Sequence, residues 1–170
     1  MQSEDKELVI RPAEPRDVGL ILELIRELAE YERLADQVVA TEEGLRAALF
    51  ERKVAHAMIA EAEGEPVGFV LYFFNLSTFE GHEGLYLEDL FVRPQYRGRG
   101  YGKALFGALA AVAQERGCPR FEWSCLDWNT PSIGFYRSLG AVPMDEWTVY
   151  RLTKKEIAAL ADSCAQGSAD

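Results

Sequence analysis

The sequence predicts an α/β protein in which a mixed β-sheet is flanked by helices. Three observations lead to this fold class. The 170 residues include 48% hydrophobic and 27% charged side chains, which suits one soluble domain, residues 1–170, with a buried core over about 8–152. Segments with strand patterns alternate with segments whose apolar residues recur at helical spacing. A short turn joins two early strands and a helix joins two later ones, which predicts antiparallel and then parallel pairing.

The first fifty residues predict one strand and two helices. Leu8–Arg11 forms a short strand that ends at a proline. Pro15 suits the first turn of a helix that runs to about Tyr31. Its apolar stripe consists of Val18, Ile21, Leu22, Ile25, Leu28 and Ala29. Thr41, which precedes two glutamates, suits the N-cap of a second, shorter helix through Phe50.

The middle of the chain predicts a hairpin, a loop and a central strand. Val54–Ala62 and Pro66–Asn75 are expected to pair around the small and polar turn Glu63–Glu65. Residues 76–84 are polar and contain glycine, which predicts a loop. The aromatic and branched run Leu85–Val92 predicts the central strand, which a proline ends.

A helix with a glycine-rich start should follow the central strand. Its helical spacing is carried by Ala104, Leu105, Ala108, Leu109, Ala111 and Val112. Arg116 and Gly117 suit its last turn and its end. The alternating apolar residues of Pro119–Leu126 then predict a strand parallel to the central one.

The last part of the chain predicts a helix, a strand and a closing helix. Either Asn129 or Thr130 can cap the first of these helices, which should end before Gly140. Glu146–Leu152 has the pattern of a final strand. Thr153–Ala161 is expected to form a short closing helix, and the tail, residues 163–170, is expected to fray.

The turn RGRGYG, residues 97–102, joins the central strand to its helix and predicts a phosphate site. Backbone N–H groups at a helix start, together with the helix dipole, favour an anion, and glycine lets the phosphate approach them. A P-loop would need a glycine at Arg97 and a serine or threonine at Ala104, and a dinucleotide fingerprint would need a glycine at Lys103 or Leu105. The spacing that fits is Arg-x-x-Gly-x-Gly, a pyrophosphate site for coenzyme A.

With the segments YLEDLFV, YRGRGYG and LDWNTPSIGFYRSLGA, the chain resembles the GNAT superfamily of N-acetyltransferases over roughly Leu8 to Leu152. The branch it resembles acts on spermidine or spermine and on thialysine. This resemblance implies a GNAT fold with a mixed sheet of about six to seven strands, acetyl-CoA as co-substrate, and a homodimer. The cofactor-binding residues it implies are Leu90, Phe91, Val92, Arg97, Gly98, Arg99, Gly100, Tyr101, Gly102, Lys103 and Asn129. For Asn129, a helix cap explains the residue type nearly as well.

Acetyl transfer to an amine needs a proton acceptor for the amine and a proton donor for the departing thiolate. Glu88 is the candidate acceptor, often through water, and Asp89 is the second choice; both are also candidate contacts of the amine. Neighbouring residues of a strand point to opposite faces, so only one of the two should face a given cleft. Tyr136 is the candidate acid. The alternatives are that Glu88 positions a loop and that Tyr136 belongs to the core.

The resemblance places Tyr31 and Glu32, at the end of the first long helix, and Phe79, in the loop, against the acceptor amine. The alternatives are an exposed helix end for Tyr31 and Glu32, and local packing for Phe79. The loop is one residue longer than in the spermidine/spermine enzymes, which weakens the polyamine assignment.

The net charge of −10 favours a small cationic amine and disfavours nucleic acid and anionic membranes as partners. No apolar run is long enough for a membrane helix, and Cys118, Cys125 and Cys164 match no metal motif, so we expect a cytoplasmic enzyme with no metal. Two other functions share the glycine turn: a non-catalytic acyl-CoA sensor and a peptide or protein lysine acetyltransferase.

Overall fold

The structure is a computed structural model that describes residues 7–166. The chain divides into two compact units, with the boundary between Leu126 and Asp127. The first unit contains a five-stranded mixed sheet in the order β1-β2-β3-β4-β5. Its first four strands pair antiparallel, and β4 pairs with β5 in parallel. The fold class is confirmed, although the described chain has fewer strands than the expected six to seven.

The elements of the first unit follow the predicted order. Strands β1 (Leu8–Pro12), β2 (His56–Ala62), β3 (Glu65–Ser77), β4 (His82–Val92) and β5 (Phe121–Trp123) form the sheet. The α-helices are α1 (Val18–Tyr31), α2 (Glu42–Arg46) and α3 (Tyr101–Glu115). Short helices are η1 (Pro15–Asp17), η2 (Ala35–Gln37), η3 (Ala47–Glu51) and η4 (Pro94–Tyr96). Thr41 caps α2 as predicted, because its side chain accepts a hydrogen bond from the Gly44 amide at 3.1 Å.

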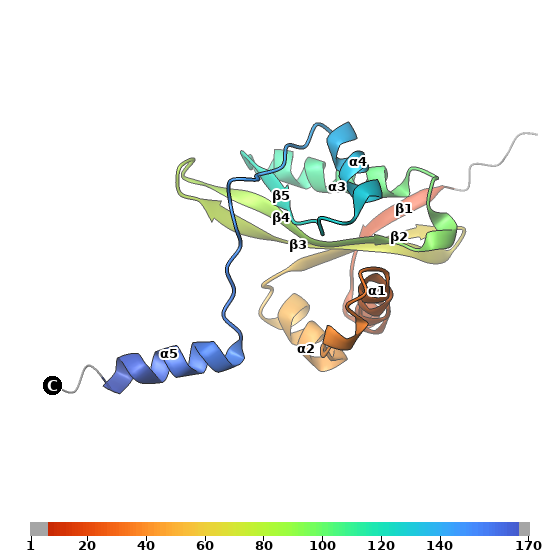
Figure 1. Ribbon diagram of the computed structural model, residues 1–170. Helices are drawn as coiled ribbons and strands as arrows, with labels where there is room; N and C mark the ends of the chain where they lie inside the picture. Colours follow the sequence, from red (N-terminus) through yellow and green to blue (C-terminus); the bar gives the residue numbers. More distant parts are fainter. Residues whose placement is uncertain (1–6, 167–170) are drawn as a thin grey trace, which may run out of the picture. The chain divides into compact units, whose positions relative to one another are not determined.

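Helices cover both faces of this sheet. Helices α1 and α2 lie on one face and α3 on the other (Figure 1). On the α1 side, buried side chains from α1, η3, β2, β3 and β4 form one cluster: Ile21, Leu24, Leu28, Leu49, Ala57, Ile59, Phe69, Leu71 and Phe91. On the α3 side, the Phe106 ring lies 5.7 Å from Phe121 and 4.9 Å from Trp123, measured between ring centroids. Full burial of side chains such as Leu24 and Phe69 stabilises the fold by about 1.5–3 kcal/mol each.

Strand β4 is irregular at its centre. Leu71 of β3 pairs with Asp89, but the next residue, Tyr72, pairs with Leu87, so Glu88 is an extra residue in β4. Such a β-bulge interrupts the alternation of side chains and bends the strand. In the described chain, β5 pairs with β4 only over Leu85–Leu87. The two parallel strands therefore part at the bulge.

The β3–β4 hairpin is longer than the sequence predicted. Its strands pair as far as Ser77 and His82, so the loop consists of residues 78–81. The expectation of a loop over residues 76–84 was wrong at both ends. The extension consists of continued antiparallel pairing of Leu76 with Glu83 and of Ser77 with His82.

The second unit contains α4 (Thr130–Ser138) and α5 (Lys154–Gln166). Within residues 127–166 the structure has no strand, so the final strand expected at Glu146–Leu152 was wrong. The side chains of this segment are exposed, with Trp147 at 76% and Tyr150 at 91%. A segment with a strand pattern forms a stable strand only when it pairs with another strand. The closing helix extends beyond Ala161 to Gln166, and the rest of the tail expected to fray, residues 167–170, lies outside the described residues. The expected single domain stays a prediction.

Candidate coenzyme and acceptor site

The glycine turn has the backbone geometry of a helix start that is open to an anion. Gly98 and Gly100 have φ of 76° and 81°, in the left-handed region that favours glycine. Gly100 is the N-cap of α3, and the first bond along the helix runs from the Ala104 amide to the Gly100 carbonyl at 3.0 Å. The amides of Tyr101, Gly102 and Lys103 therefore have no partner within the helix.

The space beside these amides is open in the described chain. A methyl group added at Gly98, Gly100 or Gly102 would meet no atom within 4 Å. Two cationic side chains, Arg99 and Lys103, are exposed at the same turn. Arg99 lies 4.0 Å from Glu63, and both side chains are largely exposed, so this pair is weak. The turn thus offers free backbone donors, positive charge and room to a diphosphate.

Arg97, the first residue of the motif, directs its side chain away from the open turn. Its Nε donates to the Val92 carbonyl at 2.9 Å. Its guanidinium lies over the Tyr31 ring at 4.6 Å and the Phe91 ring at 5.5 Å, measured to the ring centroids. The expectation that this charge surrounds the phosphate stays a prediction.

The bulge in β4 brings carboxylates together near the end of α1. Asp89 follows the bulge and shares the α1 face with its partner Leu71. Burial, and after it the charges of Glu88 and Glu32, together raise the pKa of Asp89 to about 7. Burial also raises the pKa of Glu32. These three acids form the acidic cluster.

The sequence-based argument about Glu88 and Asp89 needs a correction. That argument placed the two side chains on opposite faces because strand residues alternate, but the bulge removes the alternation at this point. Glu88 is exposed and Asp89 is half-buried. Asp89 therefore carries the perturbed carboxyl group of the pair, and Glu88 acts on it through its charge.

Phe79 lies apart from the acidic cluster in this unit. It sits at the tip of the β3–β4 hairpin and is 99% exposed. Asp89 is seven residues along β4 from His82, which is about 24 Å at about 3.4 Å per residue. The structure therefore brings Tyr31, Glu32, Glu88 and Asp89 together but does not bring Phe79 to them.

Two predicted site residues, Asn129 and Tyr136, belong to the second unit. Asn129 is buried, and its side-chain oxygen accepts from the Ser132 amide at 3.4 Å, so it caps α4 as expected. Tyr136 lies on α4, half-buried, with its ring 5.7 Å from that of Phe135. The coenzyme contact of Asn129 and the acid role of Tyr136 stay predictions.

Arg93 is a residue of this region that the sequence analysis missed. It contacts Glu23 and Glu27 of α1, the latter at 2.8 Å, and donates to the Pro66 carbonyl at 3.0 Å. These bonds hold α1 against the end of β4. The available signal was the spacing of four between Glu23 and Glu27, which puts two acids on one face of a helix.

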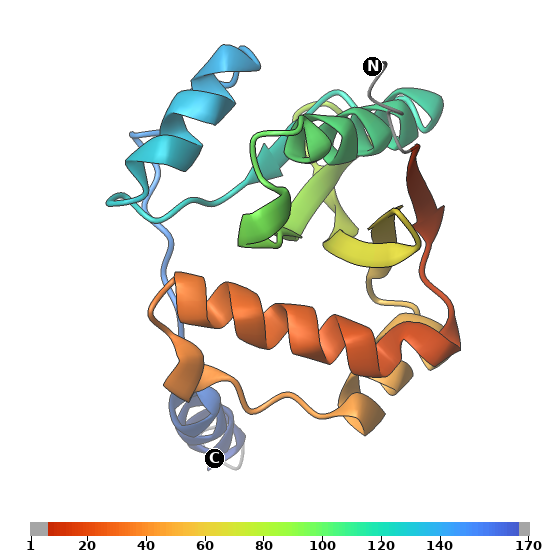
Figure 2. The ribbon, with the colours of Figure 1, turned by 90° about the vertical axis from the view of Figure 1, so that its right-hand side faces the viewer.

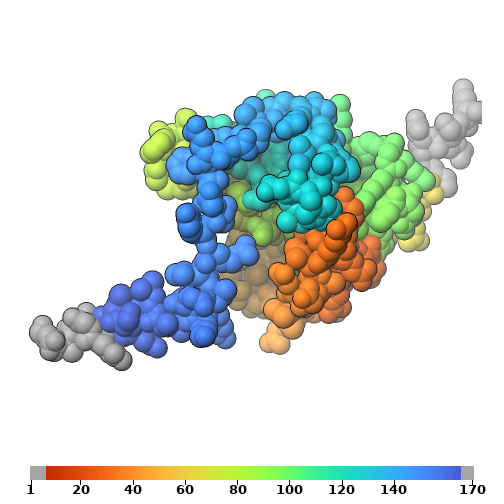
Figure 3. All heavy atoms as spheres, in the orientation of Figure 1, coloured from red at the N-terminus to blue at the C-terminus, as the bar shows by residue number. Residues whose placement is uncertain are grey.

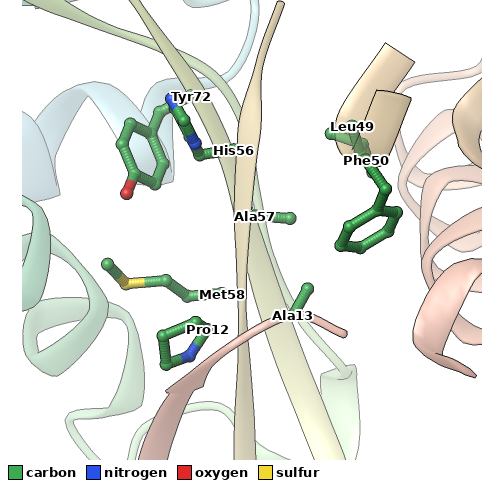
Figure 4. A pocket seen from close by; sticks show the side chains of 8 residues that line it. All are labelled: Pro12, Ala13, Leu49, Phe50, His56, Ala57, Met58 and Tyr72. Carbon is green, nitrogen blue, oxygen red and sulfur yellow. The ribbon is translucent and has the colours of Figure 1, made fainter. Parts of the chain in front are cut away.

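A separate cavity lies where β1 and β2 part, and it contains no predicted site residue. Its volume is about 140 Å³, and it is lined by Pro12, Ala13, Leu49, Phe50, His56, Ala57, Met58 and Tyr72 (Figure 4). Within residues 7–166, no group of three or more His, Cys, Asp or Glu residues is placed to hold a metal ion. No helix in that range has the length and apolar character needed to span a membrane.

Comparison with known proteins identifies the family. The model of the acetyltransferase (GNAT) family matches residues 21–141. The chain belongs to the GNAT family of acetyltransferases. Members of this family use acetyl-CoA as co-substrate, so the resemblance read from the sequence is confirmed at the level of family and reaction class.

Individual relatives agree with this family. Bovine thialysine N-ε-acetyltransferase is 43% identical to this acetyltransferase over 166 residues, which cover 91% of this chain and 97% of the bovine one. L-ornithine N5-acetyltransferase of Arabidopsis thaliana is 32% identical over 197 residues, and the match covers 89% of this chain and 86% of the Arabidopsis one. The solved structure of an integron cassette protein from V. cholerae is similar, with a TM-score of 0.76 and 26% identity. The match covers 91% of this chain and 97% of the cassette protein.

Proposed function

We propose that this acetyltransferase moves the acetyl group of acetyl-CoA directly to a primary amine of a small cationic acceptor, such as thialysine or a polyamine. The names of the thialysine and ornithine relatives support this substrate class, because both acceptors carry a primary amine on a flexible chain. The observation that carries the proposal is the open glycine turn beside a β4 strand whose bulge presents the acidic cluster.

Residues 98–103 fit the diphosphate of the coenzyme. The left-handed glycines keep side chains away from the amides, and the open space beside them would accept phosphate oxygens. Arg99 and Lys103 add positive charge. The edge of β4 at Leu90, Phe91 and Val92, beyond the β5 pairing, would face the pantetheine arm. When bound, acetyl-CoA supplies a thioester whose carbonyl carbon is the electrophile.

The acidic cluster suits the acceptor amine. An alkyl ammonium with a pKa near 10.4 must lose a proton before it can attack, which costs about 4–5 kcal/mol at pH 7. Glu32, Glu88 and Asp89 attract the cation. Asp89 accepts its proton, directly or through water, because a pKa of about 7 makes it a stronger base than an ordinary carboxylate.

Tyr136 is proposed as the acid that protonates the thiolate, and Asn129 as a contact of the coenzyme, on the resemblance alone. A phenol is protonated at neutral pH, so it can donate a proton. A homodimer is proposed on the same ground, whereas a cytoplasmic location and the lack of a metal are proposed from the sequence. Light scattering after size-exclusion chromatography would measure the oligomeric state.

The test is an acetyl-CoA assay with thiol detection against spermidine, spermine, lysine, thialysine and a lysine-bearing peptide. We expect rapid CoA release with one or more of the small amines. Release with the peptide alone would favour a peptide or protein acetyltransferase. Coenzyme binding without release for any amine would indicate an acyl-CoA sensor instead.

A further inference from the structure

The segment between β4 and α3 is held to one stripe of α1 by two arginines. Glu23, Glu27 and Tyr31 are four residues apart and therefore share a face of α1. Arg93 contacts the two glutamates, and Arg97 lies over the Tyr31 ring at 4.6 Å. The segment, coloured green, runs from the side of α1 to the start of α3 in Figure 2 and lies beside α1 in Figure 3.

Arg97 reaches both halves of the proposed site at once. Its backbone begins the glycine turn, and its Nε donates a hydrogen bond to the carbonyl of Val92, the last residue of β4, at 2.9 Å. Its guanidinium lies over the Tyr31 ring and also within 5.5 Å of the centroid of the Phe91 ring. Tyr31 directly precedes Glu32, a member of the acidic cluster. A single side chain thus connects the turn, the strand and the acceptor end of α1.

The contact acts through the ring rather than by pairing with the acids. Burial, Glu88 and Glu32 account for the raised pKa of Asp89, and Arg97 is not among the groups that shift it. A guanidinium over an aromatic face is attracted by the ring quadrupole, as a lysine ammonium would be, and it also stacks its plane on the ring, which an ammonium cannot do.

We propose that Arg97 is a positioning residue that holds Tyr31, and with it the acceptor end of α1, against the coenzyme turn. The inference rests on the proposed function and deepens it. Arg97 sets the distance between the bound amine and the acyl donor, instead of serving mainly as a ligand of the phosphates. Its loss should therefore weaken the use of the amine more than the binding of CoA.

The experiment compares Arg97→Met, Arg97→Lys, Tyr31→Leu and the Arg97→Met/Tyr31→Leu double variant. Arg16→Met is the matched control, because Arg16 is 72% exposed and pairs only with the exposed Glu14 among the described residues. For each protein, calorimetry gives the Kd of CoA, and steady-state assays give kcat and KM for the amine. Urea unfolding of the same set gives a double-mutant cycle for stability.

We expect each single variant to raise the KM of the amine about three- to fivefold, the size expected from loss of a cation–π contact at an exposed arginine, with the Kd of CoA within about twofold. The double variant should match the worse single variant, because both substitutions break one contact. Arg97→Lys, which keeps the charge but loses the planar stacking, should fall between wild type and Arg97→Met, and Arg16→Met should behave like wild type.

A rise of about tenfold in the Kd of CoA for Arg97→Met, with an unchanged amine KM, would overturn the inference and make Arg97 a phosphate ligand. Additive effects in the double variant, or no effect, would also overturn it. If wild type binds CoA but acetylates no amine, the proposed function fails instead. The unfolding cycle then decides the contact: non-additive loss of stability supports it, and additive loss refutes it.

Discussion

Substitution of Asp89 by asparagine should make the protein more stable at pH 8 and less active. The pKa of Asp89 rises from an ordinary 3.8 to about 7, so the folded state disfavours its charged form. At about 1.36 kcal/mol per pKa unit, this rise corresponds to about 4 kcal/mol as an upper limit. Asparagine keeps the shape of the side chain without the charge. We therefore expect a gain of roughly 2–4 kcal/mol in the free energy of unfolding at pH 8.

The pH dependence gives this prediction its sign. Between pH 4 and pH 7 the folded protein binds more protons at Asp89 than the unfolded chain does, so the contribution of Asp89 to the stability of wild type falls as pH rises through this range. Asp89→Asn lacks this loss. The difference between the two proteins should be small at pH 4, grow through pH 7 and then stay constant.

Urea unfolding of wild type and Asp89→Asn at half-unit steps from pH 4 to pH 8.5 measures this difference. Asp162→Asn is the control, since Asp162 is exposed on α5, and its effect should stay within about 0.5 kcal/mol. The acetylation rate of Asp89→Asn should lose the rise near pH 7 that wild type shows. A destabilised Asp89→Asn protein, or a difference that does not change with pH, would refute the reasoning about the acidic cluster.

Three further predictions concern single residues. Tyr136→Phe should lower kcat about 100-fold or more and leave the Kd of CoA unchanged, measured by thiol release and calorimetry; an unchanged kcat would remove Tyr136 as the acid. Gly100→Val should weaken CoA binding at least about tenfold and lower the free energy of unfolding by about 1–2 kcal/mol, because valine disfavours a φ of 81°. The control Gly107→Ala, in the exposed middle of α3, should change neither quantity in this way. Arg93→Met should cost about 1–3 kcal/mol in urea unfolding, since it removes bonds to two glutamates and the Pro66 carbonyl; a loss below about 0.5 kcal/mol would contradict its role in holding α1.

Local signals predicted several helix caps and helix ends. The Thr41 and Asn129 caps and the left-handed Gly117 and Gly140 all depend on a few neighbouring residues, and the structure has each of them. The glycine turn was predictable for the same reason. Its geometry follows from glycine spacing after a strand and before a helix.

The parts that failed depend on partners distant in the sequence. The strand pattern of Glu146–Leu152 has no ladder partner within residues 7–166, so its side chains stay exposed. The bulge at Glu88 follows from pairing with β3 and is invisible in the sequence of β4 alone. The resemblance favoured Glu88 as the proton acceptor, and that role stays a prediction; the structure gives the perturbed pKa to Asp89.

The side chain of Arg97 shows a similar limit. Its place in the motif predicted a phosphate contact, but the Tyr31 and Phe91 rings that hold its guanidinium lie on other elements. The backbone of the motif was therefore predictable, and the direction of its first side chain was not.

A crystal structure with bound CoA would test the central claim most directly. We predict that the diphosphate oxygens lie within about 3.2 Å of backbone nitrogens of residues 98–103, the range of an N–H···O hydrogen bond. A nucleotide bound elsewhere, with these amides facing solvent, would contradict the account.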